Sequence, residues 1–211
     1  MQDASSMGTL SALHLKGTLV TLEHLGLSQD RVLAACGLTR AAFDNPFARF
    51  RVELEHRLWA AIEQDARDPA IGLRLGAEFV QRGRYELDIY LALNSRTPRL
   101  AFQNVQTVVR LADDRGYVDV SESAEGARVG VRRDGGYPRA AGALDTMFAC
   151  AACFLHQRLP GFRLLRVHLS RPRPLDVAPY RHVFGVEPRF GALDNAIYFD
   201  AAWLDTPLMG A

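Results

Sequence analysis

The sequence predicts an α+β fold in which a helical N-terminal half packs with a small, mainly antiparallel sheet that two helices interrupt. Apolar residues recur at helical spacing up to about Leu111, whereas short alternating runs begin near Gly116. The 211 residues contain no internal repeat and no low-complexity linker, which fits one domain. We expect this domain to cover residues 10–208, after a flexible N-terminus of residues 1–9.

The first half is predicted to be a succession of helices. Ser28 and Thr97 precede two of them and are suited to accept a hydrogen bond at the helix start. Asp68-Pro69 opens another, because proline fits the first helical position. Glu55-His56 is expected to be a solvated pair on the polar face of its helix. The segments with helical spacing are 10–25, 29–36, 52–66, 69–79, 87–93 and 98–111.

The second half is predicted to alternate strands and helices. Its elements in chain order are strands 117–121 and 127–133, helix 140–158, strand 162–169, helix 177–184, and strands 187–190 and 196–199. Glu125-Gly126 is a turn signal that favours a hairpin between the first two strands. The turn-rich segment 191–195 predicts a second hairpin between the last two.

Composition excludes several classes of protein. Hydrophobic residues make up 48% and charged residues 23% of the chain, which is ordinary for a globular domain and excludes intrinsic disorder. The formal net charge of +1 argues against a stand-alone nucleic-acid binder. Three cysteines form no disulfide framework and fit a reducing cytoplasm. No apolar run reaches the roughly 20 residues of a membrane span, so we expect a cytoplasmic protein that does not bind a membrane.

Two segments invite a binding function. Segment 27–43 resembles a helix-turn-helix with Gly37 in the turn. Its second helix would offer few polar side chains for contacts with DNA bases, so a compact helical hairpin is the better interpretation. Segment 158–191 carries seven arginines against two acidic residues. This excess suits an anionic ligand, although solvated arginines on the outer face of a strand explain it more simply, with Phe162, Leu164 and Val167 pointing inward.

The sequence shows no established catalytic or phosphate-binding motif, so we expect no enzyme activity and no cofactor. One cluster suggests chemistry: Cys150, Cys153 and His156 have the spacing of one helix face and are possible ligands for a metal or partners in a redox sensor. Against this, the pair lies inside an Ala- and Phe-rich helix, where cysteine behaves as a small core residue.

The last third and two earlier segments resemble the N-terminal effector domain of AraC-family transcriptional regulators. The order and spacing of the matching residues carry this resemblance, which covers about residues 10–208. The residues are Trp59, Asp68-Pro69-Ala70-Ile71-Gly72-Leu73-Arg74-Leu75-Gly76, the helix start 95–101, Val167-His168, Pro172, Pro174, Tyr180, Phe184-Gly185, Phe190, Asn195, Phe199 and the segment 204–208.

The resemblance implies an arabinose-binding-like, ligand-sensing and dimerisation domain of a bacterial transcription factor. In such regulators a domain with two helix-turn-helix motifs follows, and we expect it to lie beyond Ala211, outside this chain. The resemblance therefore implies a homodimer, an unknown small-molecule effector, and contact with DNA only through that second domain. Binding of the effector is expected to shift the regulator between DNA-binding states.

Placement in the sequence alone suggests the ligand-contacting residues, since the resemblance supplies none. The segment 84–94 is expected to provide polar groups between the helical layer and the sheet, and neighbouring helices are expected to provide walls. The candidates are Trp59, Tyr85, Tyr90, Asn94, Phe148 and His156. Two other functions stay open: a thiol- or metal-based sensor that uses Cys150, Cys153 and His156, and a small hydrolase or isomerase with a site assembled from scattered residues.

Overall fold

A computed structural model describes residues 8–82, 87–135 and 137–210. Of the N-terminus expected to be flexible (residues 1–9), residues 1–7 lie outside the described part, whereas Thr9 belongs to a strand. The eight helices of this described part are α1 (Ala12–His24), α2 (Gln29–Ala35), α3 (Glu53–Ala66), α4 (Ile71–Arg82), α5 (Leu87–Leu93), α6 (Pro98–Ala112), α7 (Ala141–Arg158) and α8 (Ala178–Phe184). Its strands are β1 (Thr9–Ser11), β2 (Arg49–Arg51), β3 (Gly116–Ser123), β4 (Gly126–Arg133), β5 (Arg166–Leu169), β6 (Arg189–Phe190) and β7 (Ala196–Phe199). The predicted α+β class is confirmed.

The helices begin where their capping residues predict. The Ser28 side chain accepts a hydrogen bond from the Arg31 N–H at 3.2 Å, and Thr97 accepts one from Leu100 at 3.3 Å. These bonds satisfy N–H groups that have no partner within the first helical turn. All six helices predicted for the first half are present, with ends that shift by a few residues.

The main sheet has the strand order β3-β4-β7-β5-β6. Strands β3 and β4 form the predicted hairpin, in which Val118 pairs with Val131. The predicted second hairpin is wrong, because β5 lies between β6 and β7 and runs parallel to β6. Residues Ala196, Ile197 and Phe199 of β7 are completely buried, and a strand buried on both faces is most stable in the interior of a sheet.

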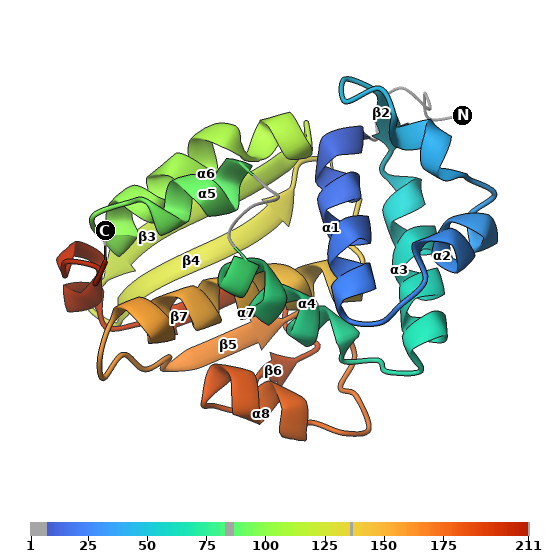
Figure 1. Ribbon diagram of the computed structural model, residues 1–211. Helices are drawn as coiled ribbons and strands as arrows, with labels where there is room; N and C mark the ends of the chain where they lie inside the picture. The colour runs from blue at the N-terminus through green and yellow to red at the C-terminus, as the bar shows by residue number, and fades with distance from the viewer. Residues whose placement is uncertain (1–7, 83–86, 136, 211) are drawn as a thin grey trace.

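Three layers are visible in Figure 1: α5 and α6 lie along the β3 side of the sheet, α7 and α4 cross the other part, and α1–α3 stand together at one end. The larger hydrophobic core lies between the sheet and helices α6 and α7, and a second core lies among α1, α2, α3 and α4. The short strands β1 and β2, which sequence patterns did not indicate, pair at the edge of this second core. The two cores thus meet along α4 and α7.

Glycines allow α4 and α7 to approach closely. A Cβ atom added at Gly72 would lie 2.5 Å from the Gly142 carbonyl oxygen, and one added at Gly76 would lie 2.5 Å from the Thr146 carbonyl oxygen. The Thr146 hydroxyl donates to both the Gly72 and Gly142 carbonyls, at 3.0 and 2.9 Å. The close packing fixes the position of α7, and with it one wall of the cavity described below.

In both segments suspected of nucleic-acid or anion binding, several arginines pair with acidic side chains. In segment 27–43, the second helix is a four-residue 3₁₀ turn, η2 (Arg40–Phe43), and Arg40 pairs with Asp30 and Glu23. This supports the compact hairpin. In segment 158–191, Phe162, Leu164 and Val167 are buried as expected. Four arginines of the segment pair with acidic residues: Arg166 with Glu125, Arg171 with Asp145, and Arg173 and Arg181 with Glu187.

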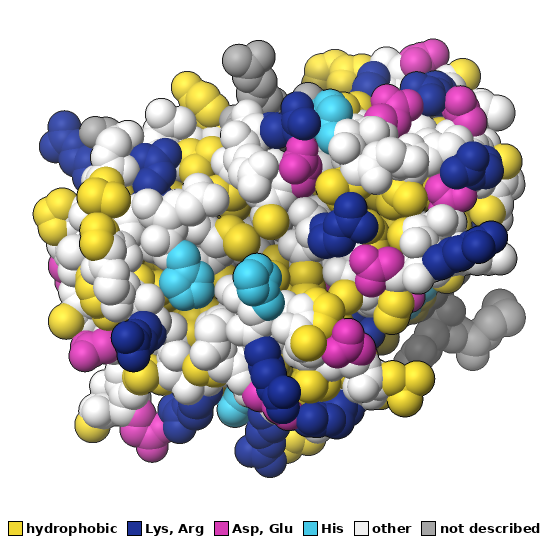
Figure 2. Space-filling model, turned by 60° about the horizontal axis from the view of Figure 1, so that its bottom comes forward, with side chains coloured by type: hydrophobic (Ala, Val, Ile, Leu, Met, Phe, Trp, Pro, Cys, Tyr) yellow, Lys and Arg dark blue, Asp and Glu magenta, His cyan; other side chains and the backbone are white. Residues whose placement is uncertain are grey.

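Figure 2 shows Lys and Arg side chains along the lower edge of one face, with acidic and hydrophobic side chains between them. Such mixing gives no extended area of one charge on this face. Within the described residues, no helix combines the length and the apolar character that crossing a membrane requires.

Candidate ligand cavity

A cavity of about 140 Å³ lies between the sheet and the helices that cover it. Helices α6 and α7 form two of its walls, strands β3 and β4 form its floor, and α1, α3, α4 and α5 contribute further lining residues. It therefore touches both hydrophobic cores. Pockets between elements of different layers are common positions for ligand sites.

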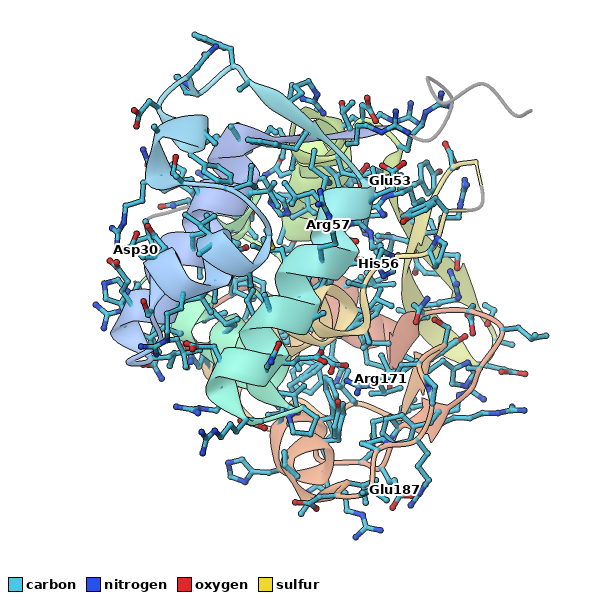
Figure 3. The ribbon with its side chains drawn as sticks, turned by 90° about the vertical axis from the view of Figure 1, so that its right-hand side faces the viewer. Asp30, Glu53, His56, Arg57, Arg171 and Glu187 are labelled. Carbon is cyan, nitrogen blue, oxygen red and sulfur yellow. The ribbon has the colours of Figure 1, made fainter. Side chains whose placement is uncertain are left out.

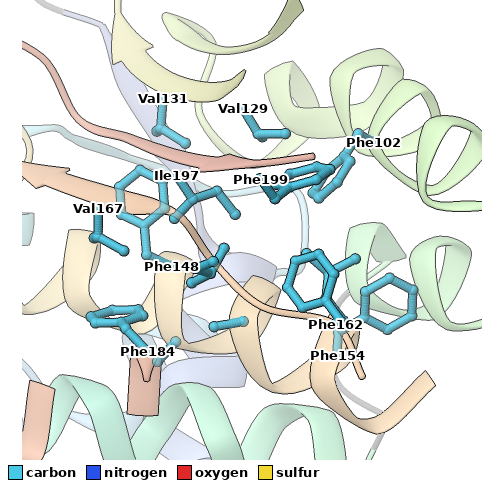
Figure 4. Packing of buried hydrophobic residues seen from close by; sticks show 14 of the residues in the cluster. Phe102, Val129, Val131, Phe148, Phe154, Phe162, Val167, Phe184, Ile197 and Phe199 are labelled. Carbon is cyan, nitrogen blue, oxygen red and sulfur yellow. The ribbon is translucent and has the colours of Figure 1, made fainter. Parts of the chain in front are cut away.

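Carbon atoms dominate the cavity surface. Figure 4 shows how its aromatic and valine side chains converge, with Phe148 and Phe154 on α7, Phe102 on α6, and Val129 and Val131 on the sheet. The remaining apolar side chains of the lining are Leu15, Leu58, Trp59, Phe79, Val80, Ile89, Ala92, Leu93, Ala101, Val105, Val109, Ala112, Val118, Ala143, Met147 and Ala151. Apolar molecules gain most from such a surface, because they leave water without losing hydrogen bonds.

The charged residues of the lining form one cluster. Glu55 comes from α3, Asp113 from the junction of α6 and β3, and Arg139 from the segment before α7. Arg139 lies 3.5 Å from a Glu55 oxygen and 2.8 Å from an Asp113 oxygen. Arg133 of β4 completes the cluster behind them, 3.1 Å from Glu55 and 2.7 Å from Asp113. We call these four residues the buried charge cluster.

The buried charge cluster is almost inaccessible to water. Its four side chains are between 1% and 4% exposed. Burial opposes the charge of Arg133, but the carboxylates of Glu55 and Asp113 outweigh it and raise the pKa of Arg133 above its ordinary value. Glu55 also accepts a hydrogen bond from the Ala140 N–H at 3.0 Å. Two positive and two negative charges therefore balance, and their partners tie α3 to β4 and to the start of α7.

The expectation that Glu55-His56 is a solvated pair is wrong. Glu55 is 2% exposed and points into the interior, whereas His56 contacts the Pro138 carbonyl oxygen through its Nε2 atom at 2.9 Å. Figure 3 shows His56 and Arg57 projecting from the outer side of α3. Helical periodicity alone did not predict this, because the cationic partners that justify burial of Glu55 lie about 80 residues away in sequence.

Two of the six suggested ligand contacts line the cavity, namely Trp59 and Phe148. Tyr90 is 55% exposed, and the exposed Asn94 donates its amide N–H to the Tyr90 carbonyl oxygen at 2.8 Å. His156 is exposed on the last turns of α7 and meets the edge of the Phe162 ring. Tyr85 lies outside the described residues. The structure brings none of Tyr90, Asn94 and His156 to the cavity, because α5 and the end of α7 turn these side chains outward.

The sequence did not indicate Glu55, Asp113 or Arg139 as cavity residues. Each is charged, and a charged residue without a visible partner is expected on the surface. A better signal was the apolar face of the α6 segment, where Ala101, Phe102, Val105 and Val109 recur at intervals of three and four around one side of the helix.

The thiol cluster has a poor environment for redox or metal chemistry. Burial raises the pKa of the Cys153 thiol, which disfavours the reactive thiolate, and burial lowers the pKa of His156. Cys150 lines the cavity instead. Among the residues that the structure describes, no group of three or more His, Cys, Asp or Glu side chains is arranged to hold a metal ion. The residues present do not fit the metal-based alternative.

Comparison with known proteins agrees with this architecture. Residues 26–208 match the family described as the arabinose-binding domain of AraC transcription regulator, N-terminal. No curated protein matches the chain. The fold is similar to that in the crystal structure of transcriptional regulator CdpR from Pseudomonas aeruginosa, with a TM-score of 0.56 and 20% identity over 73% of this chain. The chain spans 50% of the length of that structure. The chain belongs to the family of N-terminal, arabinose-binding-type domains of AraC transcription regulators.

Proposed function

We propose that this chain is the effector-sensing domain of a transcription regulator and that the cavity between α6 and α7 binds the effector. The observation that carries the proposal is an apolar space of about 140 Å³ inside a regulator domain, bordered by a single cluster of charged residues. Trp59 and Phe148 are the two suggested contacts that we retain. The sensing role requires no chemistry on the ligand, and we propose that the chain is not an enzyme.

A bound molecule would act by favouring one arrangement of the two cores. Leu58 and Trp59 of α3 belong to the α1–α4 core, whereas Phe148 and Val129 belong to the core on the sheet, and all four line the cavity. A ligand that touches both cores stabilises the arrangement in which both contacts are made. It shifts the population only by the difference in its affinity for the two arrangements.

We further propose that the domain forms a homodimer in the cytoplasm and reaches DNA only through a separate helix-turn-helix domain. The near-neutral charge of the chain and the paired arginine in segment 27–43 support this division of roles. Sedimentation velocity of the 211-residue chain at several concentrations tests the dimer. A sedimentation coefficient that stays at the monomer value up to high micromolar concentration would refute it.

A thermal-shift screen tests the sensing role. Compounds should include small aromatics, aliphatic alcohols and acids, sugars, amino acids and nucleotides. A compound at 100 times its Kd stabilises the folded state by about 2.7 kcal/mol, which corresponds to a rise in Tm of roughly 5–10 °C for a domain of this size. The rise should disappear in Ala151→Leu, which fills the cavity from α7. The absence of any compound with this cavity-dependent effect would contradict the proposed function.

A further inference from the structure

The size and chemistry of the cavity restrict the class of effector. This inference rests on the proposed function, since it concerns the same cavity. An engineered apolar cavity of about 150 Å³ is known to hold one benzene molecule. The cavity in this chain measures about 140 Å³ and has a comparable lining of aromatic, valine and leucine side chains. One substituted ring or an aliphatic group of similar size therefore fits within it.

A sugar does not suit this surface. A pentose carries a hydroxyl group on nearly every carbon, and each hydroxyl that leaves water needs a new hydrogen-bond partner. The carboxylates of Glu55 and Asp113 already accept bonds from Arg133, Arg139 and backbone N–H groups, so this border can serve one further polar group but not the several hydroxyls of a sugar. The Thr146 hydroxyl donates to carbonyl oxygens. The other polar side chains of the lining, His14, Thr18 and Cys150, are too few to replace the water around every hydroxyl of a pentose. The remaining lining is mostly aromatic, valine, leucine and alanine side chains, which offer no hydrogen bond.

The net charge of the buried charge cluster restricts the ligand further. Two arginines and two carboxylates already balance within a region that excludes water. An anionic ligand would meet Arg139 together with the carboxylates of Glu55 and Asp113, and a cationic ligand would meet carboxylates that two arginines already neutralise. Either ion would leave one uncompensated charge buried, which strongly disfavours binding. A hydroxyl or carbonyl group adds no net charge at this border.

We propose that the effector is an uncharged, mainly apolar molecule of about one substituted ring in size, with one polar group that meets the Glu55–Asp113–Arg139 border, and that it is not a sugar. The match to an arabinose-binding-type domain then describes the ancestry of the fold and not the ligand of this chain. The same reasoning predicts a preference between molecules that share a skeleton and differ only in charge.

Matched probes test this preference. Benzyl alcohol, benzoate, benzylamine and arabinose are titrated at pH 7 into the 211-residue chain, and binding is followed by ¹H–¹⁵N NMR. Benzyl alcohol should bind at least tenfold more tightly than benzoate or benzylammonium. Ala151→Leu on α7 should abolish its binding, whereas Ala60→Leu, the same change on the exposed face of α3, should leave it intact. Val105→Phe on α6 is a second cavity-filling variant for use if Ala151→Leu does not fold.

The outcomes separate the two proposals. Benzoate or benzylammonium that binds as tightly as benzyl alcohol, in a manner abolished by Ala151→Leu, would overturn the uncharged ligand and leave the sensing cavity in place. Arabinose with the same dependence on Ala151 would overturn the exclusion of sugars. Failure of all four probes to bind the cavity would overturn the assigned ligand class. If the broad screen described above also found no cavity-dependent compound, the proposed function would fail with it.

Discussion

The buried charge cluster makes a quantitative prediction about stability. In Glu55→Gln, Arg133 and Arg139 would share the single carboxylate of Asp113, and one positive charge would remain uncompensated where side chains are at most 4% exposed. Glu55 accepts bonds of 3.1 and 3.3 Å from Arg133 and of 3.0 Å from the Ala140 N–H, so the change also weakens the start of α7. Removal of one partner from a buried ion pair costs about 3–5 kcal/mol, and we expect this loss in the free energy of unfolding.

Urea unfolding followed by circular dichroism measures this loss. The matched control is Asp30→Asn, which makes the same kind of change in the exposed pair of Asp30 and Arg40, whose side chains are 69% and 52% exposed. The control should leave the free energy of unfolding nearly unchanged, because water and salt screen an exposed ion pair. The double variant Glu55→Gln/Arg139→Gln restores the charge balance and should recover part of the stability. A loss below about 1 kcal/mol for Glu55→Gln would refute the importance of the cluster.

Three further predictions concern α7 and its contact with α4. Burial raises the pKa of Asp145 to about 6, although Arg171 and a hydrogen bond from Tyr180 oppose this shift. Between about pH 4 and 6 the folded protein therefore keeps a proton on Asp145 that the unfolded chain has released. The free energy of unfolding should therefore fall by about 3 kcal/mol as pH rises through this window, at 1.36 kcal/mol per pKa unit. In Asp145→Asn, urea unfolding should show a weaker dependence of this free energy on pH, and an unchanged dependence would contradict the assignment. Gly76→Ala should lower stability by about 1–3 kcal/mol, because the added Cβ atom meets the Thr146 carbonyl oxygen; an unaltered Tm would show that α4 and α7 separate without cost. Phe148→Ala should cost about 3–5 kcal/mol in urea unfolding, and a cost below about 1 kcal/mol would mean that its ring is not packed as described.

The elements that could be predicted are those specified by local signals. Ser28 and Thr97 cap helices where the sequence places them, and the turn at Glu125-Gly126 joins β3 to β4. The position of β7 could not be predicted in this way. Its adjacent residues Ala196 and Ile197 point to opposite faces and are both buried, so β7 lies between β4 and β5 whatever turn precedes it. A short apolar strand after a turn favours a hairpin locally, and the packing of the whole sheet overrides that preference.

The candidate site was predicted only in its apolar part. Trp59 and Phe148 lie on helices with long apolar faces, so their inward orientation follows from helical periodicity. Glu55 and Arg139 meet across 84 positions of the chain, and nothing in the residues around either one indicates the other. Tyr90 was expected at the site because segment 84–94 was expected to supply polar groups, but α5 is a single short helix that packs on α6 with its other face. The polar border of the cavity is formed by charged residues that are distant in sequence and pair only in the folded chain.

Intermolecular NOEs from bound benzyl alcohol test directly whether the cavity between α6 and α7 is the effector site. The ring protons should show NOEs to the methyl groups of Val129 and Val131 on the floor of the cavity and to the Phe148 ring on its wall. These NOEs should vanish in Ala151→Leu. NOEs confined to exposed apolar side chains outside the cavity, such as Leu175 and Leu193, would contradict the assignment of the cavity as the sensing site.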